Sequence, residues 1–211
     1  DLKNYAACIV EPLLQGAGGM KMYSAVFLQK LQKYCREQGV LLIADEIFTG
    51  FYRTGTFLAS EQAQWCADLV CLSKGITGGF LPLSATVVTE NIYEMFLHNT
   101  KAKAFLHGHS YTANPIACAA AVKSYEILKR PETQKNISRL AESTTRCLVR
   151  IKEKFPNDVF NPRSLGTIGA FEFNTHEDYF TPDVSRQIVE LCFTQGVLLR
   201  PLGQTIYTVP Q

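Results

Sequence analysis

The sequence predicts an α/β fold, in which a mostly parallel sheet is followed by a smaller α+β part. Two continuous apolar runs, residues 40–45 and 68–73, have the length and composition of strands buried on both faces of a parallel sheet. Helical periodicity precedes the first run, and the composition becomes more charged after Pro131. These observations favour one larger sheet domain and one smaller mixed domain.

In the first part of the chain, strands alternate with helices. Residues 5–10 predict a short strand that ends before Glu11, and a glycine-punctuated loop follows. Apolar residues then recur at helical spacing until Gly39, which is a typical C-terminal stop. Residues 84–88 predict a third strand of the same type as residues 40–45 and 68–73.

The later elements are predicted from caps and from periodicity. Thr89 could cap a helix over 90–98, and Asn114 with Pro115 could begin a helix that continues to residue 130. After Pro131 the pattern predicts helices over 136–155 and 182–195, and strands over 166–173, 197–200 and 205–209. We therefore expect two parts, residues 1–128 and residues 129–211.

The composition argues against several functional classes. The net charge of +2 and the lack of a basic block give no footprint for nucleic acid. The longest apolar runs are far shorter than the about 20 residues that span a bilayer, so we expect no membrane partner. Seven cysteines without a C-x-x-C pair fit a reducing, cytoplasmic compartment. His107 and His109 have no third ligand at suitable spacing, so we expect no metal.

Two strands lead into charged residues that could meet at one edge of the sheet. Asp45 ends one apolar run, and Lys74 follows the next run 29 residues later. In open α/β sheets, ligands bind outside the carboxyl ends of the strands. Pyridoxal phosphate needs a lysine for its Schiff base and a carboxylate that keeps its pyridine nitrogen protonated. The pair therefore predicts a pyridoxal phosphate site.

Other interpretations of the same residues stay open. A lone aspartate after a strand is more often a cap or turn residue, and a lysine beside glycines is more often an exposed loop residue. The run "LLIADE" is also typical of the Walker B strand of a P-loop ATPase, with Asp45 near Mg²⁺. No G-x-x-x-x-G-K-[ST] loop occurs in these 211 residues, which counts against that alternative.

Several sequence blocks occur in an order that is typical of one family. The blocks are IVEPLLQGAGGMKMY, LLIADEIFTGFYRTG, LVCLSKGITGGFLPLSATVVT, HGHSYTANPIACAAA and GVLLRPLGQTIYTVP. They resemble the class III aminotransferases, which have fold type I and use pyridoxal 5'-phosphate. The stretches QGAGGM-x-MY and RPLGQTIY are most similar to the members that transfer the amino group of S-adenosylmethionine to 8-amino-7-oxononanoate, giving 7,8-diaminononanoate in biotin biosynthesis. The alternative within the family is an enzyme with an ω-amino acid or amine donor.

The resemblance implies roles for the cofactor side of the site. Lys74 matches the lysine that binds the cofactor covalently and moves protons, and Asp45 matches the partner of the pyridinium nitrogen. Ser110 aligns with a hydroxyl residue that reaches the cofactor phosphate of the other subunit, which implies a homodimer with shared active sites. Glu11 matches a glutamate at the edge of the cofactor site.

The resemblance also implies roles on the substrate side. Arg200 aligns with the arginine that binds the carboxylate of 8-amino-7-oxononanoate, and Tyr207 with a tyrosine of the same pocket. Arg53 and Gly108 align with further residues at the substrate site. From the residues alone, Arg200 could instead be a surface arginine, Tyr207 a core residue and Ser110 a capping hydroxyl.

Two residues depart from the family pattern, and some segments that the family uses to bind the cofactor are not among these blocks. His109 stands where proline is more common, and Tyr52 stands where glycine is common, so we expect changes in the phosphate-side loop and near Arg53. The resemblance implies that the glycine-rich phosphate cup and a ring-stacking aromatic precede residue 1, and that part of the smaller domain follows residue 211. We therefore expect the 211 residues alone to bind the cofactor weakly and to show no measurable turnover, as a non-catalytic piece.

Overall fold

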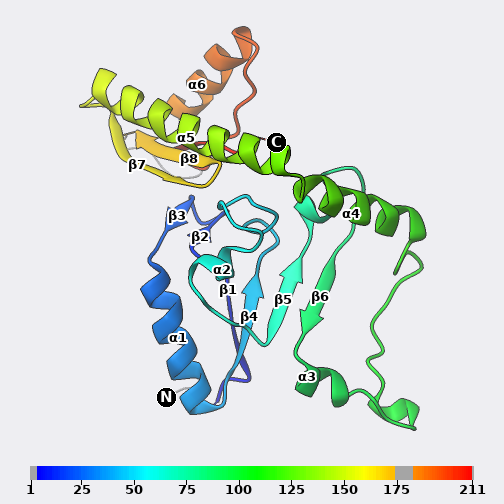
Figure 1. The fold of residues 1–211 in the computed structure, drawn as a ribbon. Helices are drawn as coiled ribbons and strands as arrows, with labels where there is room; N and C mark the ends of the chain where they lie inside the picture. The colour runs from blue at the N-terminus through cyan, green and yellow to red at the C-terminus, as the bar shows by residue number, and fades with distance from the viewer. Residues whose placement is uncertain (1–3, 174–182, 211) are drawn as a thin grey trace.

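The computed structural model describes residues 4–173 and 183–210, and Figure 1 shows how its helices and sheets are arranged. The first sheet has the strand order β1-β4-β5-β6 and consists of β1 (Ala7–Val10), β4 (Leu41–Asp45), β5 (Leu69–Leu72) and β6 (Ala85–Val88). The strands β1, β4 and β5 are parallel, so the predicted mostly parallel sheet is confirmed.

The strand β6 runs antiparallel to β5, and the prediction of a third strand of the parallel type at residues 84–88 is wrong. Parallel neighbours need a crossover of a dozen or more residues, usually a helix. The connection from β5 to β6 contains only the short turn η1 (Lys74–Thr77), so the chain returns directly along its neighbour.

The helix α1 (Ala25–Gln38) covers one face of this sheet (Figure 1). Leu28 of α1 and Leu42 of β4 are both buried and belong to the same core cluster. Gly39 ends the helix in a left-handed conformation with φ +68°, as its position after the last periodic residue predicted. This packing holds α1 against β4, the strand that ends in Asp45.

A separate three-stranded sheet is antiparallel, with the strand order β7-β8-β9. Its strands are β7 (Val159–Leu165), β8 (Ile168–Phe173) and β9 (Thr205–Thr208). The long helix α5 (Pro131–Lys154) packs against β7 and β8, and α6 (Asp183–Thr194) follows in the chain. Proline at the first helical position explains why α5 begins five residues earlier than the sequence predicted.

Two further differences concern this second sheet. The strand β7 was not predicted, because its sequence VFNPRSL has a proline and the polar residues Asn, Arg and Ser in its middle and lacks a clear alternation. The strand predicted at residues 197–200 is absent, so that prediction is wrong. The amide of Val197 donates to Cys192 O at 2.9 Å and closes the end of α6, which takes this backbone group away from strand pairing.

The remaining elements are short, except for one helix. They are β2 (Leu14–Gln15), β3 (Lys21–Met22), α2 (Ala59–Gln62), α3 (Glu90–Glu94), η2 (Lys101–Lys103) and α4 (Pro115–Leu128). The side chain of Asn114 accepts hydrogen bonds from the first amides of α4, as the Asn-Pro pair predicted. The helix α4 packs against η1, directly after β5.

The strands β2 and β3 join the two sheets. They pair antiparallel to each other and lie next to β7 and β8 in Figure 1. Leu14 and Met20, from the beginning of the chain, share a buried cluster with Ile168 and Ala170 of β8. The residues between β2 and β3 are therefore held by contacts from the last third of the sequence.

Substitution of Gly166 by alanine tests the contact between the β7–β8 turn and the loop after β4. A Cβ at this position would lie 2.3 Å from Thr54 C and 2.5 Å from Arg53 O, which are backbone atoms, and φ is +56°. We expect Gly166→Ala to lower the free energy of unfolding by about 2 to 4 kcal/mol, measured by chemical denaturation. Gly39→Ala is the control: φ is +68° and nothing lies within 4 Å, so we expect a loss of about 1 kcal/mol. Equal losses in both variants would contradict the steric argument.

Candidate active site

The carboxyl ends of the three parallel strands bring Glu11, Asp45 and Lys74 to one edge of the sheet. Glu11 directly follows β1, Asp45 is the last residue of β4, and Lys74 comes two residues after β5. The register aligns these ends, since Val10 lies beside Ala44 and Asp45 lies beside Cys71. This is the edge at which ligands bind in parallel sheets.

Lys74 has an unusual backbone and an accessible side chain. Its φ is +48°, a left-handed conformation that costs a residue with a Cβ about 1 kcal/mol, and such outliers concentrate at functional sites. The side chain is exposed, and Nζ lies 5.2 Å from the centre of the Phe48 ring. Within the described residues, Lys74 forms no ion pair. Its amine is therefore available for reaction.

Contacts on both sides of Lys74 hold its turn in place. Ser73 Oγ donates to Leu83 O at 2.9 Å, and Ser124 Oγ of α4 donates to Gly75 O at 3.2 Å. A Cβ on Gly75 would lie 2.9 Å from two side-chain atoms of Phe51. The glycine after the lysine is thus explained by packing on Phe51, a reason that the sequence alone does not reveal.

Asp45 has one carboxylate oxygen in a turn. Oδ1 accepts a hydrogen bond from the amide of Ile47 at 3.1 Å, which is the turn contact of the simpler interpretation. Oδ2 has no hydrogen bond to any other residue in the described part of the chain. The half-buried carboxylate can therefore hold its turn and still accept a hydrogen bond from a cationic ring nitrogen.

Glu11 organises the glycine-rich loop at the end of β1. Glu11 Oε2 accepts a hydrogen bond from Gly16 N at 2.9 Å, and the Tyr23 hydroxyl donates to Glu11 O. Burial raises the pKa of Tyr23 to about 12, so this hydroxyl keeps its proton throughout the neutral range. A Cβ on Gly16 would lie 3.0 Å from Phe48 Cδ1, which brings the loop against the ring that faces Lys74.

Glu46 is a buried residue whose importance the sequence reasoning missed. Its side chain is 0% exposed, and its carboxylate accepts hydrogen bonds from Ala59 N at 3.0 Å, from Ser60 N at 2.8 Å and from the Thr49 hydroxyl. These bonds close the loop that carries Phe48. Successive side chains of an extended chain point to opposite faces, so the residue after Asp45 would face the core, and this alternation is the signal that could have identified Glu46.

Arg53 connects the loop after β4 to the end of the chain. Nη1 donates to Thr167 Oγ1 at 3.3 Å and also to Pro210 O. The Arg53 carbonyl accepts a hydrogen bond from Thr167 N at 3.1 Å. Burial lowers the pKa of the Arg53 guanidinium from its usual value. In this structure, the residue expected near the substrate binds the β7–β8 turn.

Tyr52 occupies a position with φ +65°, a left-handed backbone conformation that glycine adopts more readily than other residues. Its ring packs edge-on against Phe57, with centroids 5.7 Å apart, and its hydroxyl accepts a hydrogen bond from Gln134 of α5 at 2.8 Å. These contacts direct the side chain towards α5.

Gly108 and His109 line a cavity of about 820 Å³ that reaches Ser73, the neighbour of Lys74. Ser110 is exposed and lies between His109 and Tyr111, which both line this cavity. His109 Nδ1 accepts a hydrogen bond from Tyr111 N at 3.1 Å. His109 therefore forms part of the turn that presents Ser110.

The two C-terminal candidates are less closely connected to Lys74. Tyr207 pairs with Ala170 through its backbone and packs against the cluster that contains Leu14 and Met20. Arg200 has an exposed side chain in the segment between α6 and β9. Among the described residues, no hydrogen bond or ion pair links Arg200 to Lys74 or Asp45. The structure thus places Glu11, Asp45 and Lys74 at one edge of the parallel sheet, while Arg200 lies in the segment before β9.

Three further properties concern cysteines, metal ligands and membrane-spanning helices. All seven cysteines are free thiols. In the ranges 4–173 and 183–210, no group of three or more His, Cys, Asp or Glu side chains could hold a metal ion. The helices in those same ranges are too short or too polar to cross a membrane.

Comparison with known proteins gives consistent matches over nearly the whole chain. A model of the family described as aminotransferase class-III matches residues 2–211. The adenosylmethionine-8-amino-7-oxononanoate aminotransferase of Synechococcus elongatus is 44% identical over 205 residues, which cover 97% of this chain and 47% of that protein. The chain therefore spans about half the length of this relative.

Solved structures agree with the sequence comparison. An amine transaminase from an uncultivated Pseudomonas species, solved with PLP bound, has a TM-score of 0.86 and 32% identity over 97% of this chain and 47% of its own. Ornithine aminotransferase from Toxoplasma gondii has a TM-score of 0.85 and 29% identity over 99% of this chain and 47% of its own. Because the family model covers residues 2–211, the interpretation of residues 41–46 as the Walker B strand of a P-loop ATPase is excluded. The chain belongs to the class III aminotransferases, with about half of their type I fold.

Proposed function

We propose that the protein to which this chain belongs transfers the amino group of S-adenosylmethionine to 8-amino-7-oxononanoate, with pyridoxal phosphate held on Lys74. The observation that carries the proposal is the position of Lys74 and Asp45 at the carboxyl ends of neighbouring parallel strands, in a family that uses this cofactor. The name of the Synechococcus elongatus relative supports the choice of substrates.

The residues present fit pyridoxal phosphate. The Lys74 amine is exposed and forms no ion pair within the described ranges, and Asp45 Oδ2 can accept a hydrogen bond from the ring nitrogen. When bound, the cofactor supplies an electron sink for the negative charge that develops at the substrate Cα. Asp45 would stabilise the positive charge on that ring nitrogen.

Four residues have a specific task in this proposal. Lys74 Nζ would take the proton from Cα of the donor and return it, as base and then as acid. Arg200 would pair its guanidinium fork with the acceptor's carboxylate, and Tyr207 would line the same pocket. Ser110 would reach the cofactor phosphate of a second subunit, so the active unit would be a homodimer.

The proposed organisation extends to domains and compartment. Residues 1–128 would form the C-terminal part of the large cofactor domain, and residues 129–211 part of the smaller domain. This division is supported by α4, which packs against η1, and by α5, which packs against β7 and β8. Seven free thiols support a reducing compartment such as the cytoplasm. We expect turnover in the full-length protein and none measurable in the 211 residues alone.

The amino donor can be tested by absorbance spectroscopy on the full-length protein loaded with pyridoxal phosphate. Addition of S-adenosylmethionine should remove the absorbance of the lysine-bound cofactor, because the amino group is transferred to it. β-Alanine and ornithine serve as matched donors for the alternative substrates in the same family. Loss of the absorbance with either of these, but not with S-adenosylmethionine, would assign the protein to another class III activity.

A further inference from the structure

The loop of residues 16–20 is a closed turn beside the candidate site. Gly16 N donates to Glu11 Oε2 at 2.9 Å, and the amides of Gly19 and Met20 donate to Gly16 O at 3.2 and 3.1 Å. These bonds satisfy the inner side of the turn. The carbonyls of Gly19 and Met20 accept their hydrogen bonds from outside the loop.

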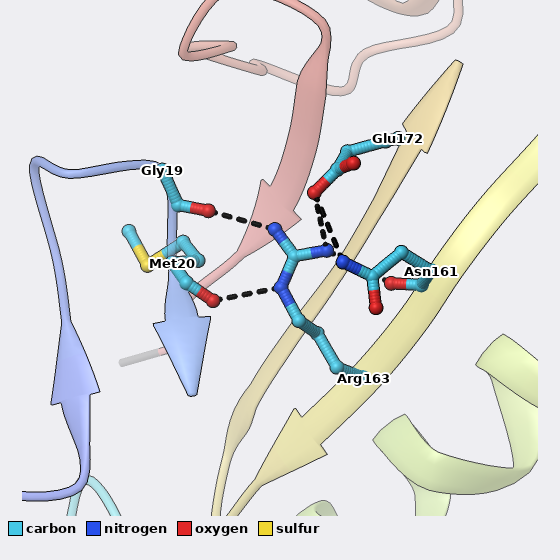
Figure 2. Close-up of polar contacts among 5 residues, drawn as sticks. All are labelled: Gly19, Met20, Asn161, Arg163 and Glu172. Carbon is cyan, nitrogen blue, oxygen red and sulfur yellow. Dashed lines mark hydrogen bonds and ion pairs between the residues drawn. The ribbon is translucent and has the colours of Figure 1, made fainter. Parts of the chain in front are cut away.

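Arg163 of β7 donates to both carbonyls, as Figure 2 shows. Nε lies 2.7 Å from Met20 O, and Nη2 lies 2.7 Å from Gly19 O. Nη1 lies 2.8 Å from Asn161 O and 2.8 Å from Glu172 Oε1. The Arg163 side chain is only 10% exposed, so this planar fork has a single fixed orientation.

The opposite side of the loop faces the ring next to Lys74. The position of a Cβ on Gly16 is 3.0 Å from Phe48 Cδ1, and the centre of the Phe48 ring is 5.2 Å from Lys74 Nζ. Phe48 also packs against the cluster that contains Met20. A shift of the loop would therefore move a side chain that contacts the lysine ammonium.

We propose that Arg163 is a positioning residue for this site. Arg163 holds the loop of residues 16–20, and through Gly16 it fixes the position of the Phe48 ring beside Lys74. All three guanidinium nitrogens already bind four acceptors, so Arg163 acts through the loop and not on a substrate. The inference rests on the proposed function, since it takes Lys74 as the reacting amine.

The test compares Arg163→Met with Arg146→Met in the full-length protein loaded with pyridoxal phosphate. Arg146 is the control because it lies on α5 with 69% of its side chain exposed, and its ion pair is with Glu142, which is also exposed. In Arg163→Met, we expect amide hydrogen exchange at Gly19 and Met20 to rise about tenfold, the effect of losing one charge-assisted hydrogen bond. Amides of β4 should keep their exchange rates in both variants.

Steady-state kinetics distinguish a positioning role from a role in stability alone, because a role in stability alone would leave KM unchanged. We expect the KM for S-adenosylmethionine to rise about tenfold in Arg163→Met while kcat stays within about threefold, because Lys74 and Asp45 are unaltered. In Arg163→Lys, we expect a smaller rise in KM than in Arg163→Met, because the lysine ammonium can donate to one of the two loop carbonyls. Arg146→Met should match the unaltered protein in both constants.

Several results would overturn the proposal. Equal exchange at residues 16–20 in Arg163→Met and Arg146→Met would do so, as would faster exchange without a change in KM. If Arg163→Met does not fold, Glu172→Gln removes one charged acceptor of the guanidinium and should raise exchange at the same amides by a smaller factor; unchanged exchange there would also refute it.

Failure of the proposed function gives a different result. An unaltered protein that transfers no amino group from S-adenosylmethionine refutes the proposed donor. The role of Arg163 can still be tested in that case by amide exchange and by the absorbance of the lysine-bound cofactor. If Arg163→Met changes neither the exchange rates at residues 16–20 nor this absorbance, the positioning role is refuted.

Discussion

Lys74→Ala in the full-length protein should reduce kcat for amino transfer by at least about 10⁴-fold, because it removes the covalent attachment point and the acid–base group together. Borohydride reduction of the unaltered protein with pyridoxal phosphate should label the peptide that contains Lys74. The variant should lose this label. Peptide mapping and steady-state kinetics measure the two effects separately.

Two variants separate the chemistry of Lys74 from its charge and its fold. Lys74→Arg keeps a cation over the Phe48 ring but cannot form the attachment, so it should be as inactive as Lys74→Ala. Lys33→Ala, at an exposed position of α1, should keep full activity and the label. Label on another lysine of the unaltered protein would refute the assignment.

Glu46→Ala should lower the free energy of unfolding by about 3 to 5 kcal/mol, the largest stability loss that we expect from a single truncation. The substitution leaves the amides of Ala59 and Ser60 and the hydroxyl of Thr49 without their acceptor, and each buried group costs about 1 to 3 kcal/mol. Urea denaturation of the full-length protein gives the difference.

The controls for Glu46 distinguish buried hydrogen bonds from charge. Glu61→Ala removes an exposed carboxylate from α2, close to the groups that Glu46 binds, and should change the stability by less than about 0.5 kcal/mol. Glu46→Gln keeps one acceptor oxygen and should fall between the two. A loss in Glu46→Ala no larger than in Glu61→Ala would mean that these bonds do not stabilise the fold.

The elements that could be predicted from the sequence are those whose signal is local. The strands before Asp45 and Lys74 are continuous apolar runs, and Asn114 directly precedes the proline that begins α4. The direction of β6 and the existence of β7 depend on pairing with distant segments. Alternation and composition within these segments carry no information about such pairing.

The candidate site shows the same division. Asp45 and Lys74 became candidates because each lies at the end of an apolar run, and the parallel pairing of β4 and β5 places both at one edge of the sheet. Glu46 and Arg163 were missed because their partners are mostly backbone groups, which are present at every position and leave no motif. The fixed position of the loop at residues 16–20 becomes visible only when β7 is folded against it.

The hydrogen bonds around the site span most of the chain, which affects the order of folding. Arg163 is 143 and 144 residues from its two loop carbonyls, and Arg53 is 157 residues from Pro210. Contacts with such large sequence separation form late, because the entropy of closing the intervening chain must be overcome first. At about 5 to 20 residues per second, a ribosome needs roughly 7 to 30 s between the synthesis of the loop and that of Arg163. Lys74 is made within that interval, so the nascent chain carries the reacting amine before Arg163, which holds the loop of residues 16–20, has been synthesised.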